Sequence, residues 1–160
     1  MKKNQAVKTI VAVLTGLAGG AIVTTKLKNN IICAKDEKID KFKLYYNLLN
    51  QWLMIKQEGK NLEQFFLDKN YHSIAIYGMG EMGNRLYEEL KGTSIEVKYA
   101  IDKNAGKTYS ELEVVELEDD LKKVDVIVVS AVFAFDEIEV ELSEKMDCPI
   151  ISLEDVVYEL

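Results

Sequence analysis

The feature that most constrains the fold of this 160-residue chain is a glycine motif between a strand-like segment and a helix-like segment. Residues 73–77 read Ser-Ile-Ala-Ile-Tyr, a short apolar run that is typical of a buried parallel strand. Residues 78–83 read Gly-Met-Gly-Glu-Met-Gly, and Met82, Leu86 and Leu90 recur at a four-residue spacing. The pattern predicts a strand, a tight turn and a helix.

The three glycines have separate physical roles in such a turn. Gly78 permits the tight turn, Gly80 lets the main chain approach a pyrophosphate, and Gly83 lets the helix lie close to the strand. The main-chain N–H groups at the start of the helix then face the anion. Asp102 ends a strand predicted over residues 95–101, 24 residues after Gly78, near the spacing expected for a carboxylate that binds ribose hydroxyls. Because a carboxylate there repels a 2′-phosphate, the pattern disfavours NADP and leaves a nucleotide-sugar and an NAD-type dinucleotide open as ligands. A turn of the same shape that binds nothing is the alternative.

Strand-like and helix-like segments alternate along the rest of the chain. Residues 124–129 and 149–151 predict two more strands, and residues 136–146 and 153–160 predict helices. This alternation predicts an α/β fold, a small doubly wound, Rossmann-like parallel sheet of about four to five strands. In such sheets, ligands lie beyond the carboxyl ends of the strands. The residues predicted to bind the cofactor at those ends are Gly78, Met79, Gly80, Glu81, Met82, Gly83, Asp102, Lys103, Asn104 and Ser130.

The amino-terminal segment, residues 1–35, carries six lysines and no acidic residue. Residues 9–25 within it are uncharged and lie between Lys8 and Lys26. A helix of that length spans about 25 Å, slightly less than the ~30 Å hydrocarbon core, and flanking lysines can reach the headgroups. We therefore expect one transmembrane helix over about residues 9–25, in contact with membrane lipid, with a cleaved signal peptide as the alternative.

Charge does not decide the orientation of this helix, because three lysines lie on each side of it. A nucleotide ligand favours one orientation, since nucleotides are scarce outside the cytosol. The expectation is a single-pass membrane protein whose carboxyl-terminal domain is cytoplasmic.

A helical collar is predicted over residues 36–70, between the anchor and a Rossmann-like domain over residues 71–160. A first helix extends to about residue 60, where Gly59 is a natural stop. Its apolar surface is wide, so it must be covered either by the following domain or by a second copy of itself. One of its stripes has alternating three- and four-residue spacing and consists of Ile39, Phe42, Tyr46, Leu49 and Leu53.

The net charge of −7 is unevenly distributed and excludes one class of function. Residues 110–160 hold 16 acidic residues against three lysines, so this part of the chain presents no basic face for nucleic acid. Within it, residues 118–120 are predicted to begin a short helix, where carboxylates favour the helix dipole. Two cysteines and one histidine exclude a disulfide scaffold and a multi-histidine metal site. No catalytic acid, base or nucleophile is predicted, which leaves enzymatic activity undecided.

Three segments together carry a resemblance to a known family: residues 74–83, residues 102–104 and residues 126–130. They resemble the small Rossmann-type nucleotide- or nucleotide-sugar-binding domain of bacterial surface-polysaccharide biosynthesis proteins. The segment is similar to the amino-terminal domain of bacterial sugar acetyltransferases and to domains appended to capsule glycosyltransferases. The resemblance covers residues 72–160 and implies that Gly78, Gly80, Gly83 and Asp102 approach the nucleotide. The left-handed repeat and the transferase domain of those relatives do not follow here, so their catalysis is not implied.

The function expected from these features is a membrane-anchored accessory module that binds a nucleotide or nucleotide-sugar during bacterial surface-polysaccharide biosynthesis. A non-catalytic interaction or dimerisation module with a degenerate Rossmann-like domain is the first alternative. An NAD-binding subunit of an oxidoreductase is the second. A homodimer and a membrane-associated transferase are the two protein partners that these hypotheses allow.

Overall fold

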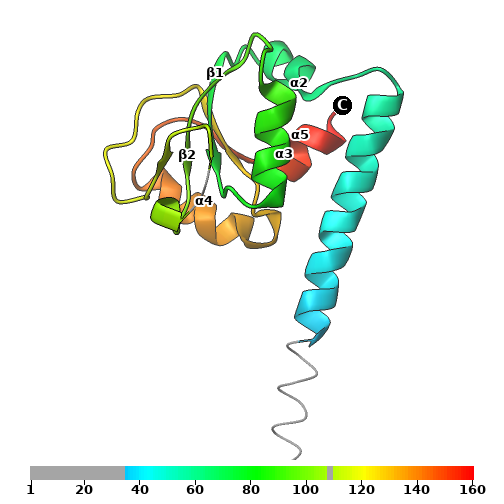
Figure 1. Cartoon of the computed structure of the whole chain (residues 1–160), viewed down its shortest axis with the longest axis horizontal. Helices are drawn as coiled ribbons and strands as arrows, with labels where there is room; N and C mark the ends of the chain where they lie inside the picture. The colour runs from blue at the N-terminus through cyan, green and yellow to red at the C-terminus, as the bar shows by residue number, and fades with distance from the viewer. Residues whose placement is uncertain (1–34, 108–109) are drawn as a thin grey trace, which may run out of the picture. The chain divides into compact units, whose positions relative to one another are not determined.

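The computed structural model describes residues 35–107 and 110–160. Residues 35–57 are helical, and the contacts divide the chain between residues 44 and 45, so that Tyr45–Leu160 forms one compact unit that contains the sheet (Figure 1). Within the described residues, no helix is long and apolar enough to cross a bilayer. The transmembrane helix predicted over residues 9–25 lies outside the described residues.

A five-stranded parallel sheet forms the centre of the unit and has the strand order β3-β2-β1-β4-β5. The fold is therefore α/β and Rossmann-like, as the alternation of segments predicts. The chain moves from β1 toward one edge and then returns to the other side of β1 with β4, so the strand order reverses between these two strands. The strands are β1 (Ser73–Tyr77), β2 (Glu96–Ile101), β3 (Val114–Val115), β4 (Val126–Val129) and β5 (Ile150–Ser152).

Helices cover both faces of the sheet. Helix α3 connects β1 to β2 and contacts both strands, and α2 contacts α3 and α5 (Figure 1). Helix α4 connects β4 to β5 and packs on the opposite face. The helices are α2 (Leu62–Asp68), α3 (Glu81–Leu90), α4 (Phe135–Ser143) and α5 (Leu153–Tyr158), with the 3₁₀ turns η1 (Ala105–Lys107) and η2 (Val132–Ala134).

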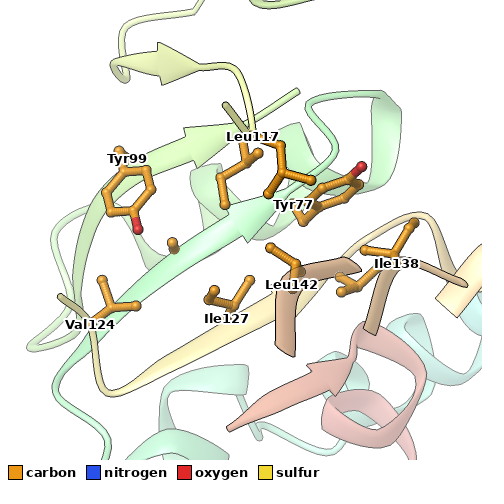
Figure 2. Packing of buried hydrophobic residues seen from close by; sticks show 10 residues of the cluster. Tyr77, Tyr99, Leu117, Val124, Ile127, Ile138 and Leu142 are labelled. Atoms are coloured by element: carbon orange, nitrogen blue, oxygen red, sulfur yellow. The ribbon is translucent and has the colours of Figure 1, made fainter. Parts of the chain in front are cut away.

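The core under α4 is made of alternate strand residues, because successive side chains of a strand point to opposite faces. Ala75 and Tyr77 of β1 lie on this face, and Ile138 and Leu142 of α4 pack against it (Figure 2). Between β3 and β4 the chain forms no helix, and Leu117 from that connection covers part of the same face (Figure 2). This connection supplies apolar cover that a crossover helix provides in a larger sheet of this type.

The helix that ends at residue 57 presents two apolar stripes within the unit. The inner stripe is buried and consists of Leu48, Trp52 and Ile55. The outer stripe is exposed and consists of Tyr46, Leu49 and Leu53. The domain therefore covers one stripe of this wide apolar surface and leaves the other exposed.

Glu89 of α3 links this helix and α2 to the sheet domain. Its carboxylate accepts hydrogen bonds from the Trp52 Nε1–H at 2.6 Å and from the Leu62 main-chain N–H at 2.9 Å. The Lys56 Nζ lies 3.1 Å from the same carboxylate. Because Leu62 is the first residue of α2, the negative charge also lies at the positive end of that helix dipole.

One predicted element is wrong and one was not predicted. Residues 118–120 begin no helix; they lie in a turn in which the Asp119 side chain accepts a hydrogen bond from the Glu116 N–H at 2.8 Å. A side chain that bonds the main chain locally competes with helix formation. Strand β3 was not predicted, because its two residues are too few to show a periodic pattern.

Candidate functional site

The turn from β1 to α3 lies at the carboxyl ends of β1 and β4, where the strand order reverses. Gly78 follows β1 with φ of +91°, a conformation that residues with a Cβ rarely adopt. Its N–H donates to the Ile101 carbonyl at 2.8 Å, and its carbonyl accepts the Ser130 Oγ–H at 2.6 Å. The Ser130 N–H in turn donates to the Tyr77 carbonyl at 2.9 Å. The three central strands therefore hold the start of the glycine loop.

Gly83 lies where α3 packs directly against this loop. A Cβ placed on Gly83 would lie 2.0 Å from the Gly78 carbonyl oxygen and 3.2 Å from the Ser130 Oγ. Any side chain at residue 83 would therefore push the helix away from the loop. This is the steric reason for the third glycine of the motif.

Gly80, unlike Gly83, has open space around its Cα. A Cβ at this position would meet nothing within 4 Å, and the residue is exposed. Gly80 is also the N-cap of α3, where no side chain caps the helix end. The first N–H groups of a helix have no carbonyl partner within it. The loop therefore offers main-chain donors to solvent at a point where no side chain obstructs approach.

Asn84 fixes the shape of the loop from the second turn of α3. Its Nδ2 donates to the carbonyls of Met79 and Gly80, each at 2.9 Å. This residue was not among the predicted site residues. An amide side chain four positions after the second glycine was the available signal, because residues four apart share one helix face.

Asp102 follows β2 and lies beside the glycine loop, as the spacing predicts. Its Oδ2 accepts the Met79 N–H at 2.8 Å, and its Oδ1 accepts the Asn104 N–H at 2.8 Å. The carboxylate thus joins the glycine loop to the turn after β2. A carboxylate oxygen has two lone pairs, so each oxygen can accept one further hydrogen bond from a hydroxyl.

The remaining predicted residues divide between the interior and the rim of the site. Met79 and Met82 are buried, and their side chains belong to the core. Glu81 is exposed in the first turn of α3. Lys103 is exposed, and its Nζ lies 3.7 Å from a carboxylate oxygen of Glu141 on α4. The rim therefore carries both signs of charge.

Tyr77 is a second residue of the site that is not among the predicted site residues. It lies at the end of β1 near Leu117 (Figure 2), and its buried hydroxyl has no hydrogen-bond partner among the described residues. Burial raises the pKa of the Tyr77 phenol, and the negative charges of Glu141 and Asp102 raise this pKa further. The phenol is therefore neutral at physiological pH and can donate a hydrogen bond.

The arrangement is suited to binding an anion with an attached polyol. Main-chain N–H groups at the start of α3 can receive phosphate oxygens, and the carboxylate of Asp102 can receive hydroxyl groups. Among the described residues, no three His, Cys, Asp or Glu side chains gather in a way that could hold a metal ion. The glycine loop, Asp102, Asn104 and Ser130 lie together, whereas Lys103 pairs with α4.

No protein-family model, curated protein or solved structure matches this chain.

Proposed function

We propose that this chain is a membrane-anchored module that binds a nucleotide or nucleotide-sugar, as an accessory of bacterial surface-polysaccharide biosynthesis. The observation that carries the proposal is the turn from Gly78 to Gly83, which lies where the strand order reverses. Gly78 has a positive φ, Gly83 has no space for a Cβ, and Gly80 opens to solvent. These are the three separate demands of a turn that accepts a pyrophosphate.

In this proposal, phosphate oxygens accept hydrogen bonds from the uncapped N–H groups of α3. The ribose hydroxyls donate to Asp102, whose loop contacts leave each oxygen one lone pair. Asp102 repels a 2′-phosphate on the ribose that it binds, so UDP-type and NAD-type ligands are preferred over NADP.

The membrane part of the proposal rests on residues 9–25, whose uncharged sequence is flanked by lysines. A single-pass anchor places the binding domain beside membrane-associated transferases, and the carboxyl-terminal domain is then cytoplasmic. With a tag at the carboxyl terminus, external protease is expected to leave the tag intact in whole cells and to remove it after lysis. Removal of the tag in whole cells contradicts this orientation.

The binding test uses the full chain in detergent micelles, titrated calorimetrically with UDP, UDP-sugars, CDP-linked compounds, NAD and NADP. Heat of binding is expected with at least one ligand of the first four kinds and a weaker signal with NADP. Absence of heat and of a thermal shift with every ligand rejects the binding proposal.

The variant Gly80→Val tests whether a ligand binds at the glycine loop. A Cβ at residue 80 would meet no atom within 4 Å, and valine is a poorer N-cap than glycine, so the free energy of unfolding is expected to fall by no more than about 1 kcal/mol. The same side chain obstructs the approach to the α3 N–H groups, so the dissociation constant is expected to rise about tenfold or more. Glu88→Val, an exposed change near the other end of α3, is the matched control. Equal affinity in Gly80→Val and wild type would place the ligand elsewhere.

A further inference from the structure

We infer that the chain associates with a second copy of itself through the helix that ends at residue 57, the two helices lying parallel along their outer stripes. The inference concerns a surface that the proposed ligand binding does not use. The parallel orientation of the two helices rests on the proposed membrane anchor. Two copies anchored in one membrane run away from it in the same direction, so their helices are parallel.

The packing of the domain leaves the outer stripe uncovered. Tyr46, Leu49 and Leu53 are 61%, 42% and 56% exposed, although each is a large apolar or aromatic side chain. At ~100° per residue, the inner and outer stripes lie about a third of a turn apart. Burying the inner stripe against the domain therefore directs the outer stripe away from it.

The spacing of the outer stripe is that of a two-helix seam. Tyr46, Leu49 and Leu53 are separated by three and then four residues, and the sequence continues the same alternation backward through Phe42 and Ile39. A repeat of 3.5 residues keeps apolar positions facing a partner helix over successive turns. The inner stripe of Leu48, Trp52 and Ile55 has the same alternation, separated by four and then three residues, and the domain already covers it.

The charge of this segment favours a second copy as the partner. Residues 45–55 contain no charged side chain, although the whole chain carries a net charge of −7. Two copies of a negatively charged chain repel each other on approach. Contact through an uncharged exposed helix lowers this electrostatic repulsion. Asn50 beside the stripe is polar without charge, so it can lie at the rim of a contact between copies.

A cavity of about 230 Å³ borders the same stripe. It is lined by Leu49, Trp52, Leu53, Lys56, Arg85 and Glu89. Side chains of one helix in a paired seam insert into holes on the other. A hollow that is open beside Leu49 and Leu53 provides such a place for a side chain of the second copy.

Cysteine cross-linking tests both the contact and its orientation. The background is the full chain in its membrane with Cys33→Ser and Cys148→Ser, and Tyr46→Cys and Leu53→Cys are introduced separately. In a parallel seam each introduced cysteine lies next to the same cysteine of the second chain, so each variant is expected to form a disulfide-linked dimer under mild oxidation. Asn47→Cys, exposed on another face of the helix, is the control and is expected to stay monomeric. Equal cross-linking of all three variants, or none, overturns the inference.

A mass measurement provides a second test that needs no cysteine. By light scattering in detergent micelles, the wild-type protein mass is expected to equal two chains, and Leu49→Glu is expected to reduce it to one. Asn47→Glu is the matched control and is expected to retain two chains. Circular dichroism, together with the fluorescence of Trp52, checks that both variants fold. A wild-type mass of one chain, or a Leu49→Glu mass of two, overturns the inference.

Discussion

Gly83→Ala is expected to lower the free energy of unfolding by about 3 kcal/mol or more, because overpacking that forces the main chain to move is at the upper end of single-residue effects. The added Cβ would lie 2.0 Å from the Gly78 carbonyl oxygen, far inside contact distance. Main-chain atoms cannot rotate away as a long side chain can, so either α3 or the loop must shift. The shift also disturbs the Ser130 hydrogen bond to Gly78.

The sign of the stability change caused by Gly83→Ala distinguishes two explanations. Gly83 lies inside α3, and Ala is favoured over Gly within a helix by about 1 kcal/mol. Helix propensity alone therefore predicts that Gly83→Ala stabilises the protein, whereas the close contact predicts the opposite. Urea unfolding of the full chain in detergent, followed by Trp52 fluorescence, measures the difference.

Two further variants separate the contact from other causes. Gly80→Ala adds the same methyl group in open space and is expected to change stability by less than about 0.5 kcal/mol. Ser130→Ala in the Gly83→Ala background removes the Ser130 Oγ, which lies 3.2 Å from the added Cβ, and it is expected to restore little stability because the Gly78 carbonyl remains. A Gly83→Ala protein as stable as wild type contradicts the geometry of the loop.

The sequence predicts β1 and β4 well because each is a continuous apolar run. Residues 73–77 form β1 as predicted, the segments at 95–101 and 124–129 contain β2 and β4, and the segment at 149–151 overlaps β5. Strands β1 and β4 are buried on both faces of the sheet along almost their whole length, which gives them their uniform composition. Strand β2 begins at the exposed Glu96 and is buried only over its last three residues. Strand β3 is a two-residue edge strand that pairs only with β2, so no such run marks it.

The sequence predicts where the site lies in the fold, but it does not predict the individual hydrogen bonds of the site. The spacing of the glycines and of Asp102 places them together, since parallel strands end at one edge of the sheet. The bond from the Met79 N–H to Asp102 depends on the direction of single groups in two loops, which no periodic pattern encodes. The carboxylate therefore has a structural role in the loop in addition to the ligand contact proposed for it.

Polar contacts between residues far apart in the chain are also not predictable from the sequence pattern. Glu89 lies on a helix whose pattern marks Leu86 and Leu90 as core, and nothing in that pattern distinguishes it from the exposed Glu88. Its role depends on Trp52 and Leu62, which are 37 and 27 residues away in the chain.

Glu89→Ala is expected to destabilise the protein by about 2–4 kcal/mol, because hydrogen bonds to a charged group are stronger than neutral ones and their removal leaves buried donors unpaired. The change removes the acceptor of both the Trp52 Nε1–H and the Leu62 N–H. The Trp52 side chain stays within the core, where water cannot easily replace the carboxylate. Urea unfolding gives the free energy, and Trp52, as the only tryptophan, reports the local change by fluorescence.

Matched variants show that the effect belongs to this carboxylate. Glu88→Ala alters the neighbouring exposed residue and is expected to change stability by less than about 0.5 kcal/mol. Glu89→Gln keeps one acceptor oxygen but turns an amide toward the second donor and loses the charge that faces Lys56, so an intermediate loss is expected. A double-mutant cycle with Trp52→Phe is followed by circular dichroism, because this change removes the only tryptophan. Trp52→Phe is expected to cost less in the Glu89→Ala background than in the wild type, since their shared bond is already absent. Strict additivity of the two changes would mean that the Trp52 bond does not hold the helix to the domain.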